Sequence, residues 1–404
     1  MPLLYSMVGP GHPPTDNFGH APTITSYPLM FTYPFAYAVA SSLALWESGT
    51  LRQAGVWEMP LGRSRVLIAA QSLLPVVMLA WASLIRPVSM ALLMEGVWPT
   101  WLSLRPLAMG LIVALCHTVI GFAVGRRLPR IIGAPLLAVT TWVAVAFAVT
   151  VDAPWARHIS GQFPEQLMFG EAAAFDALWP HVAVAGSLAL AVALLWAPTR
   201  LVWLPWALSL CVLAGGIVGT YSAVEDYDYN PPLLTAIADM PCARSAPQGP
   251  RVCMPQATAS SLTQAVEYTE QVLTSLRDAG VERRPELVID SLPDGRFSKP
   301  STATTWRAPL TLAAQQKDLK FALVVTAVRL DCGRPDPLLR RVTIAWAARI
   351  THTEEAWDRF RAGIDRGNGQ SYGVVDRKLD EVSALSPQAQ AAWFNDSVSK
   401  ACAR

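Results

Sequence analysis

Charge is scarce in the first half of this chain. Residues 1–224 contain ten Arg, no Lys and eight acidic residues, whereas residues 225–404 contain 22 basic and 22 acidic residues. Charged residues make up 15% of the chain, against about 25% in an average soluble protein. This shortage predicts a membrane half followed by a polar domain of ordinary composition. The net charge of +2 gives no basis for nucleic-acid binding.

Several catalytic motifs are also missing. The sequence has no GxxxxGKS or GxxxxGKT phosphate loop, no HExxH zinc motif, no GxSxG nucleophile motif and no CxxC pair. His352 with Glu354 or Glu355, in "THTEE", could form an acid–base pair, although the start of a surface helix explains these residues better. We therefore expect no enzymatic activity, no metal and no cofactor.

Six segments are long and apolar enough to cross a membrane. Each has about 20 residues, the length that ~30 Å of hydrocarbon requires, and none has a charged residue in its interior. The predicted spans are Pro28–Trp46, Val66–Ile85, Pro106–Gly125, Ile131–Val151, Ala177–Thr199 and Leu201–Val224. Pro87–Leu104 is also apolar, but its Glu95, Pro99 and two Trp residues favour an interfacial or re-entrant piece over a seventh span.

The arginines between the spans predict the orientation. With Met1 outside the cell, the cytoplasmic connections hold seven arginines and the outer connections hold three, as the positive-inside rule requires. The seven are Arg52, Arg63, Arg65, Arg126, Arg127, Arg130 and Arg200. Six spans then leave the domain after Val224 outside the cytoplasm of a plasma-membrane protein.

Residues 1–27 are predicted to be an extracytoplasmic segment. They contain no Arg or Lys and so lack the basic start of a signal peptide. Two explanations remain open for "MPLLYSM": it is the outer end of a further span encoded upstream, or it belongs to a short translocated tail.

The cysteines agree with an outer C-terminal domain. Cys116 and Cys211 lie within apolar spans, where free Cys acts as a small hydrophobe. The other four cysteines lie in the domain placed outside, where disulfides persist. Because "CARSAPQGPRVC" closes a short loop, we pair Cys242 with Cys253 and, by elimination, Cys332 with Cys402. Sequence alone allows three pairings.

The polar half is predicted to be α-rich with a minor sheet. Residues 225–260 resemble a linker that carries the first cysteine pair, and residues 261–404 form the domain. Helices are expected from Ser261 to Gly280, from Pro337 to Ile350 and from Pro387 to Cys402, because each begins or ends at a suitable cap. "ELVID" and "STATTWRAPLTL" are predicted strands, while "FALVVTAVRL" fits either a strand or a buried helix. The fold class is thus an all-α polytopic membrane domain, residues 28–224, followed by an α-rich α+β extracytoplasmic domain.

Two features within the spans deserve separate interpretations. His117 is an ionisable residue deep in the membrane half; such residues often mark a pathway, but a neutral His bonded to neighbouring backbone is the better explanation. Gly121 with Gly125, and Gly215 with Gly219, have the spacing of close helix contacts. These pairs are weak evidence for dimerisation.

A short charged segment separates the first two spans. This elbow, Glu47–Arg65, contains five charges between two uncharged runs. Thr50–Glu58 is predicted to form two helical turns along the membrane surface, with Leu51, Ala54 and Trp57 on one side.

The elbow resembles the coupling helix of permease subunits of type-two ABC exporters. There an acidic residue ends one span, a short helix follows, and a proline, a small residue and Arg precede the next span. The resemblance covers roughly residues 28–224, with "GRRLPR" similar to the second cytoplasmic connection, and the outer domain looks similar to the tails of some actinobacterial permease-like proteins. It implies a contact with a cytoplasmic ATPase through Glu47, Thr50, Leu51, Arg52, Trp57, Pro60, Arg63 and Arg65.

The resemblance therefore implies a permease that pairs with itself or a relative and is driven by a separate ATPase. An alternative stays open: a membrane-anchored binding or immunity protein, whose outer domain does the work and whose spans only hold it. Substrate identity does not follow from the sequence, because the spans contain no charged cavity.

Overall fold

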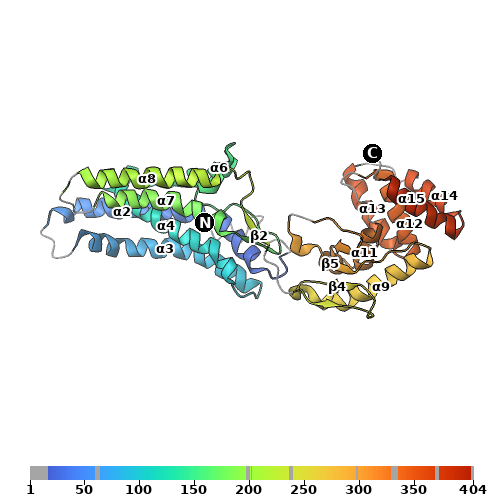
Figure 1. The fold of residues 1–404 in the computed structure, drawn as a ribbon. Coiled ribbons are helices and arrows are strands. Elements are labelled where there is room, and N and C mark those ends of the chain that lie inside the picture. Colours follow the sequence, from blue (N-terminus) through green and yellow to red (C-terminus); the bar gives the residue numbers. More distant parts are fainter. Residues whose placement is uncertain are drawn as a thin grey trace. The chain divides into compact units, whose positions relative to one another are not determined.

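The chain forms two compact units in a computed structural model, and each unit has its own hydrophobic core. The first unit is Met1–Thr235 and the second, the C-terminal domain, is Ala236–Arg404 (Figure 1). The structure describes residues 17–59, 64–196, 201, 203–235, 240–296, 299–328, 335–368 and 373–401.

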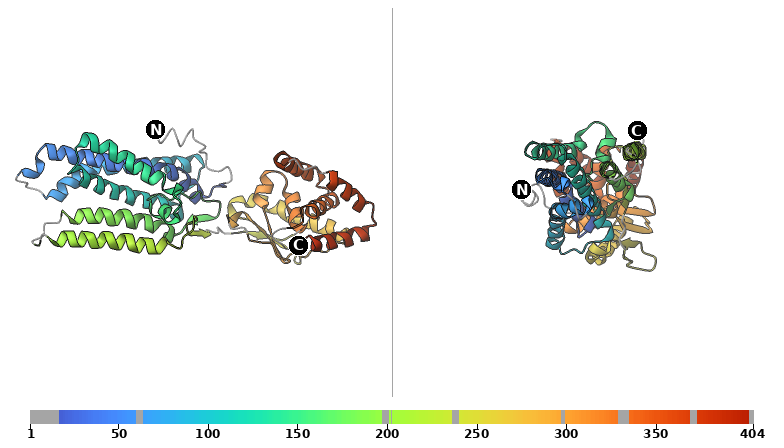
Figure 2. Two further views of the ribbon diagram at one scale, coloured as in Figure 1. Left: turned by 90° about the horizontal axis from the view of Figure 1, so that it is seen from above. Right: turned by 90° about the vertical axis from the view of Figure 1, so that its left-hand side faces the viewer.

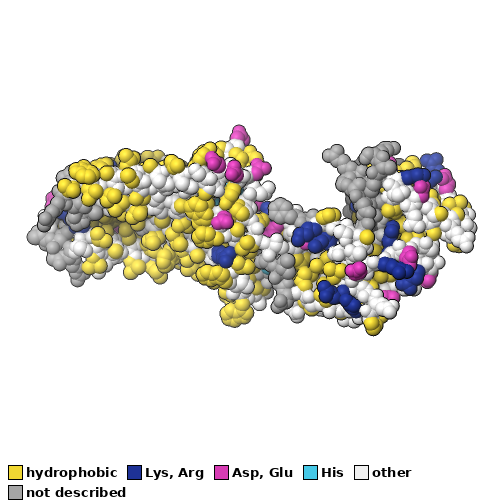
Figure 3. Space-filling model, in the orientation of Figure 1, with side chains coloured by type: hydrophobic (Ala, Val, Ile, Leu, Met, Phe, Trp, Pro, Cys, Tyr) yellow, Lys and Arg dark blue, Asp and Glu magenta, His cyan; other side chains and the backbone are white. Residues whose placement is uncertain are grey.

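The first unit is a bundle of six helices that are long and apolar enough to cross a membrane (Figures 1 and 2). Hydrophobic side chains cover its long face (Figure 3), as expected of a surface that meets lipid. The helices are α2 (Ala21–Gln53), α3 (Arg65–Met94), α4 (Trp101–Gly125), α5 (Arg130–Ala146), α7 (Phe175–Leu194) and α8 (Trp203–Val224). They confirm apolar helices at the six predicted spans, and by length and composition they indicate a multi-pass membrane protein.

The prediction of a separate interfacial piece at Pro87–Leu104 is wrong. Pro87–Met94 continues α3, and Trp101 begins α4 after a short turn. A capping box starts α4, because the Thr100 hydroxyl accepts from the N–H of Ser103 while the Ser103 hydroxyl accepts from the N–H of Thr100. Pro87 does not end α3, because a proline can bend a helix without ending it when helix-forming residues follow. Here the residues that follow are "VSMALLM".

Two glycines of α4 bring this helix into backbone contact with α2. A Cβ atom on Gly121 would lie 2.1 Å from the Ser41 carbonyl oxygen, and one on Gly125 would lie 2.4 Å from that of Leu45. The pair therefore serves packing within the chain. A Cβ on Gly215 or Gly219 of α8 would meet nothing within 4 Å, so this second pair has no packing role among the described residues.

Short elements join α5 to α7 and extend beyond α8. They are a 3-10 turn (Ala148–Thr150), α6 (Pro154–Ile159), β1 (Glu171–Ala173) and β2 (Leu233–Thr235). β1 and β2 pair antiparallel, and α6 and β2 lie at the same end of the bundle (Figure 1). The first eleven residues of the predicted 225–260 linker thus belong to the membrane unit.

The C-terminal domain contains a four-stranded sheet in the order β3, β4, β5, β6. β3 and β4 are antiparallel, whereas β4, β5 and β6 are parallel. The strands are β3 (Cys242–Ala243), β4 (Arg251–Cys253), β5 (Leu287–Asp290) and β6 (Thr305–Ala308). β5 confirms the strand predicted at "ELVID", and β6 occupies the centre of "STATTWRAPLTL". The second half of the predicted linker is therefore part of the sheet.

Seven α-helices occur among the described residues of this domain. They are α9 (Leu262–Asp278), α10 (Leu310–Gln315), α11 (Leu319–Val328), α12 (Pro337–Ile350), α13 (Glu354–Asn368), α14 (Gly373–Ser383) and α15 (Pro387–Lys400). α11 resolves the ambiguous "FALVVTAVRL" as a buried helix. α12 and α15 begin as predicted, because the side chains of Asp336 and Ser386 cap their first N–H groups.

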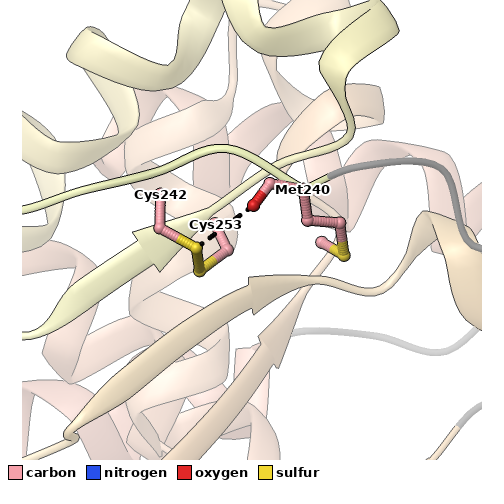
Figure 4. Close-up of a disulfide and its surroundings, with 3 residues drawn as sticks. All are labelled: Met240, Cys242 and Cys253. Atoms are coloured by element: carbon pink, nitrogen blue, oxygen red, sulfur yellow. Dashed lines mark hydrogen bonds between the residues drawn. A yellow bond between two sulfur atoms is a disulfide. The ribbon is translucent and has the colours of Figure 1, made fainter.

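The first predicted disulfide is present. Cys242 and Cys253 face each other across β3 and β4 and form an S–S bond (Figure 4). Closing a loop of this length stabilises a domain by roughly 3 kcal/mol on a chain-entropy estimate. Cys332 and Cys402 lie outside the described residues, so their bond stays a prediction. Among described neighbours, the N–H of Asp336 donates to the carbonyl of Ala401.

The two glycine pairs give opposite expectations for the same substitution. Gly121→Ala should lower the free energy of unfolding by about 1–3 kcal/mol, because the new methyl group overlaps the backbone of α2. Gly215→Ala should be neutral or stabilising by up to about 1 kcal/mol, because it only improves helix propensity. Thermal unfolding of both variants in detergent checks this, and equal shifts would contradict the packing role of Gly121.

Candidate functional site

Arginines from four segments converge at one end of the bundle. Arg52 ends α2, Arg65 begins α3, Arg126 and Arg127 follow α4, and Arg130 begins α5. We call this the arginine end. Burial, and then the positive charges of Arg65 and Arg127, lower the pKa of Arg126 below its ordinary value. The charges are thus close enough to repel one another, as suits a surface that faces anionic headgroups.

The elbow differs from its predicted form. α2 continues without a break through Glu47 to Gln53, so the predicted surface helix from Thr50 to Glu58 does not form as a separate element. A turn at Ala54 and Gly55 follows, and then one 3-10 turn, Val56–Glu58. Within the helix the Thr50 hydroxyl donates back to the Trp46 carbonyl, and Gly49 leaves room for a neighbouring side chain.

That neighbour is Arg130, which ties the beginning of α5 to α2. Its guanidinium donates to the Thr50 hydroxyl at 2.7 Å and lies over the Trp46 ring, 4.9 Å from the ring centroid. A Cβ atom on Gly49 would be 2.8 Å from the Arg130 Cβ. The cation therefore has both a hydrogen-bond acceptor and an aromatic face.

Arg52 ties α2 to the turn after α4. Its two terminal nitrogens donate to the carbonyls of Arg126 at 2.9 Å and Leu128 at 3.1 Å. Carbonyls at a helix C-terminus have no intrahelical partner, and their partial negative charge favours a cation. Arg52 thus caps α4 from a different helix and fixes the elbow against it.

Leu51 and Trp57 pack inside the chain. Both contact a small apolar cluster that includes Ala44 and Phe122. The Trp57 and Phe122 rings meet edge to face at 6.3 Å, and Trp196 packs on the other side of Phe122 at 5.0 Å. Their apolar surface is therefore partly used in folding. Among the described residues of the elbow, the exposed ones are Gln53, Ala54, Glu58, Met59, Ser64 and Arg65.

The remaining members of the predicted contact set have mixed outcomes. Glu47 and Thr50 are half-buried, and Arg65 begins α3 at an exposed position. Ser64 caps α3 by accepting from the N–H of Leu67. Pro60 and Arg63 lie outside the described residues. The structure thus holds Arg52 on the turn after α4, packs Trp57 on Phe122 of α4, and packs Leu51 on the cluster that contains Phe122. It leaves a rim of four exposed residues, Gln53, Ala54, Glu58 and Met59.

The other candidate residues have structural explanations. His117 bonds to the Val113 carbonyl at 2.9 Å and stacks on Tyr37, which agrees with a neutral, locally bonded histidine. His352 is exposed in the turn before α13, and Glu354 and Glu355 begin that helix. No group of His, Cys, Asp or Glu side chains that could hold a metal occurs in the described part of the chain.

One buried carboxylate of the C-terminal domain was not predicted. Asp290 ends β5, and burial raises its pKa above the ordinary value. It accepts hydrogen bonds from the backbone N–H and the hydroxyl of Thr311, in the first turn of α10, and from the N–H of Leu292. These contacts make it a cap that joins the sheet to α10.

The burial of the connection between α5 and α7 was also not predicted. Residues 160–168 have no helix or strand, yet Gly161, Gln162, Phe163 and Leu167 are buried among the spans. We call residues 160–168 the re-entrant segment. The sequence signal was a loop, "HISGQFPEQLMFG", with several large apolar residues and few charges.

Removal of the Arg52 guanidinium tests the arginine end. Arg52→Gln should lower the free energy of unfolding by about 1 kcal/mol, because two carbonyls of the α4 turn lose a charged donor at a partly exposed site. Arg127→Gln is the matched control, since Arg127 is exposed in the same turn. Thermal midpoints in detergent provide the measurement. If Arg52→Gln has the same thermal midpoint as the control, the Arg52 cap does not contribute to stability.

Comparison with known protein families, with curated proteins and with solved structures finds no match to this chain.

Proposed function

We propose that the chain is the membrane-spanning permease subunit of an ABC-type exporter, driven by a separate cytoplasmic ATPase. The observation that carries the proposal is the fixed elbow. Arg52 holds the end of α2 on the turn after α4, and four exposed residues, Gln53, Ala54, Glu58 and Met59, form a rim there. A partner that pushes on this rim would move α2, α4 and α5 together.

The proposal places the arginine end in the cytoplasm and the C-terminal domain outside. Two observations support this orientation. The arginines cluster at one end of the bundle, as the positive-inside rule requires of the cytoplasmic face. The chain leaves α8 at the opposite end, and the domain that follows contains the Cys242–Cys253 disulfide, which is typical of an oxidising compartment.

The second candidate function is a membrane-anchored binding protein. A specific observation favours it: the C-terminal domain has a complete core of its own, with a sheet, seven helices and a disulfide. Such a domain can fold and bind without help from the spans. In that case the elbow would have no partner.

A pull-down distinguishes the two functions. Wild-type protein should retain an ABC ATPase, whereas Met59→Arg should retain at least about tenfold less, because a charge enters an apolar contact. Met94→Arg is the matched control: Met59 is 53% exposed and Met94 is 72% exposed, but Met94 ends α3 at the other end of the bundle. Membrane abundance is measured in parallel for all three proteins.

The outcomes separate clearly. If no ATPase accompanies even the wild type, the exporter proposal fails and the anchored binding protein is favoured. If Met59→Arg retains as much ATPase as Met94→Arg, the contact lies elsewhere. Trp57→Asp does not serve here, because it disrupts the cluster around Phe122 and so lowers the amount of folded protein.

The orientation has its own test. A cysteine at Ser64, exposed at the start of α3, should react with a membrane-impermeant thiol reagent only from the cytoplasmic side. A cysteine at Gln316, exposed after α10, should react only from the outside. The comparison uses vesicles of both orientations, with the unsubstituted protein as the blank. Labelling of both sites from one side would refute the proposed topology.

A further inference from the structure

The re-entrant segment (160–168) reaches membrane depth. Arg105 lies in the second turn of α4 and Arg126 directly follows the helix. The 21 residue steps from one to the other correspond to about 32 Å at 1.5 Å per residue, close to the ~30 Å thickness of hydrocarbon. Gly161 contacts Val113: a Cβ atom on Gly161 would lie 3.1 Å from Val113 Cγ1. Val113 is eight residues, or about 12 Å, below Arg105 on α4.

Non-helical backbone at this depth needs partners inside the protein, because hydrocarbon offers none. Gly161 has two. Its N–H donates to Nδ1 of His181 on α7 at 3.1 Å, and its carbonyl accepts from the Tyr37 hydroxyl on α2 at 2.8 Å. Its φ of +88° suits glycine, which has no Cβ to clash. Two helices therefore hold the backbone of this one residue in place.

The next residue completes a hydrogen bond that α2 cannot make alone. The carbonyl of Met30 would normally accept from the N–H four residues later, but residue 34 is a proline and has no N–H. The Gln162 side-chain amide donates to this carbonyl at 3.0 Å. The re-entrant segment thus supplies the hydrogen bond that Pro34 removes from α2. Phe163 and Leu167, each 1% exposed, fill the same core as Tyr37.

The segment continues into β1, which pairs with the last strand of the membrane unit. In an antiparallel pair of strands, opposite residues form hydrogen-bonded and non-hydrogen-bonded pairs in alternation. Because the N–H of Ala174 donates to the carbonyl of Pro232, the same alternation makes Ala172 and Leu234 the next hydrogen-bonded pair and leaves Thr235 in a non-bonded position. The C-terminal domain begins directly after Thr235.

Further contacts join the two chain segments on this side. His158 of α6 bonds through Nε2 to the Asp228 carbonyl at 2.8 Å, and the Tyr229 hydroxyl donates to the Asp152 carbonyl at 3.0 Å. The chain that leads to the C-terminal domain is therefore bonded along several residues to the chain that enters the bundle.

We propose that the re-entrant segment is a gate between α2, α4 and α7, and that β2 controls it through the β1–β2 ladder. Displacement of β2 draws β1 outward. The pull then reaches Gly161 and Gln162, which leave Tyr37, His181 and the Met30 carbonyl. Water enters the bundle as far as Val113. This device is independent of whether an ATPase drives the bundle.

A cysteine at Val113 reports the state of the gate. Val113 is fully buried beneath the re-entrant segment, so Val113→Cys should react slowly with a charged maleimide in lipid nanodiscs. The background is Cys116→Ala with Cys211→Ala, which removes the free thiols of the described spans. The same background without Val113→Cys gives the blank. The assay requires neither transport nor a known orientation.

Two variants should open the gate, and each has a matched control. Tyr37→Phe removes the bond to the Gly161 carbonyl and should raise the labelling rate about tenfold or more. Tyr33→Phe should leave it unchanged, since the equally buried Tyr33 hydroxyl donates at the same 2.8 Å to Pro106 of α4 instead.

Leu234→Pro removes a ladder donor and should also raise the labelling rate, whereas Thr235→Pro should not.

Either failed contrast overturns the proposal. Equal rates for Tyr37→Phe and Tyr33→Phe would mean that the segment is no gate. Equal rates for Leu234→Pro and Thr235→Pro would mean that β2 does not control it. If Leu234→Pro does not fold, as judged by size-exclusion chromatography, Leu234→Gly weakens the same strand while keeping the N–H, and the same contrast applies.

Discussion

In hydrocarbon, every backbone N–H and C=O group needs a partner inside the protein, and this requirement decides where the membrane unit is specialised. Each proline within a span removes one helical hydrogen bond. In α2, Pro34 leaves the Met30 carbonyl to be satisfied from outside the helix, and Gln162 supplies the donor. Further polar contacts of the bundle lie where regular structure ends or breaks: at Gly161, and at the α4 turn that Arg52 caps.

The parts of the fold that could be predicted from the sequence depend on composition or on local interactions. Spans follow from composition, because a charge at mid-bilayer is costly. α12 and α15 follow from local capping chemistry at Asp336 and Ser386. The Cys242–Cys253 bond follows from a short loop in a polar domain. In each case the determining interaction lies within a few residues of the chain or depends only on average apolarity.

The errors share the opposite property. The predicted separate helix from Thr50 to Glu58 does not form, because Thr50 belongs to α2, where its hydroxyl accepts from Arg130, 80 residues away. The 225–260 linker fails because its residues find strand partners in β1 and in β4 with β5. The packing of Trp57 on Phe122 and of Gly121 on Ser41 is equally non-local. Such contacts join residues far apart in the chain, so neither the inward packing of the elbow nor the re-entrant segment could be predicted from the sequence.

Helix α2 joins the two specialised ends. At one end Arg52 and Thr50 are bonded to α4 and α5; toward the other, Tyr37 holds Gly161, and the Thr23 hydroxyl donates to the Met168 carbonyl. Between them α4 touches α2 backbone to backbone at Ser41 and Leu45, so the two helices cannot slide without losing contact along their length. A displacement of the elbow therefore reaches the seat of the re-entrant segment through one continuous helix. Few hydrogen bonds hold the re-entrant segment, and they come from α2 and α7. The contact of this segment with those helices, rather than the close-packed α2–α4 interface, is therefore where the bundle can have two discrete arrangements.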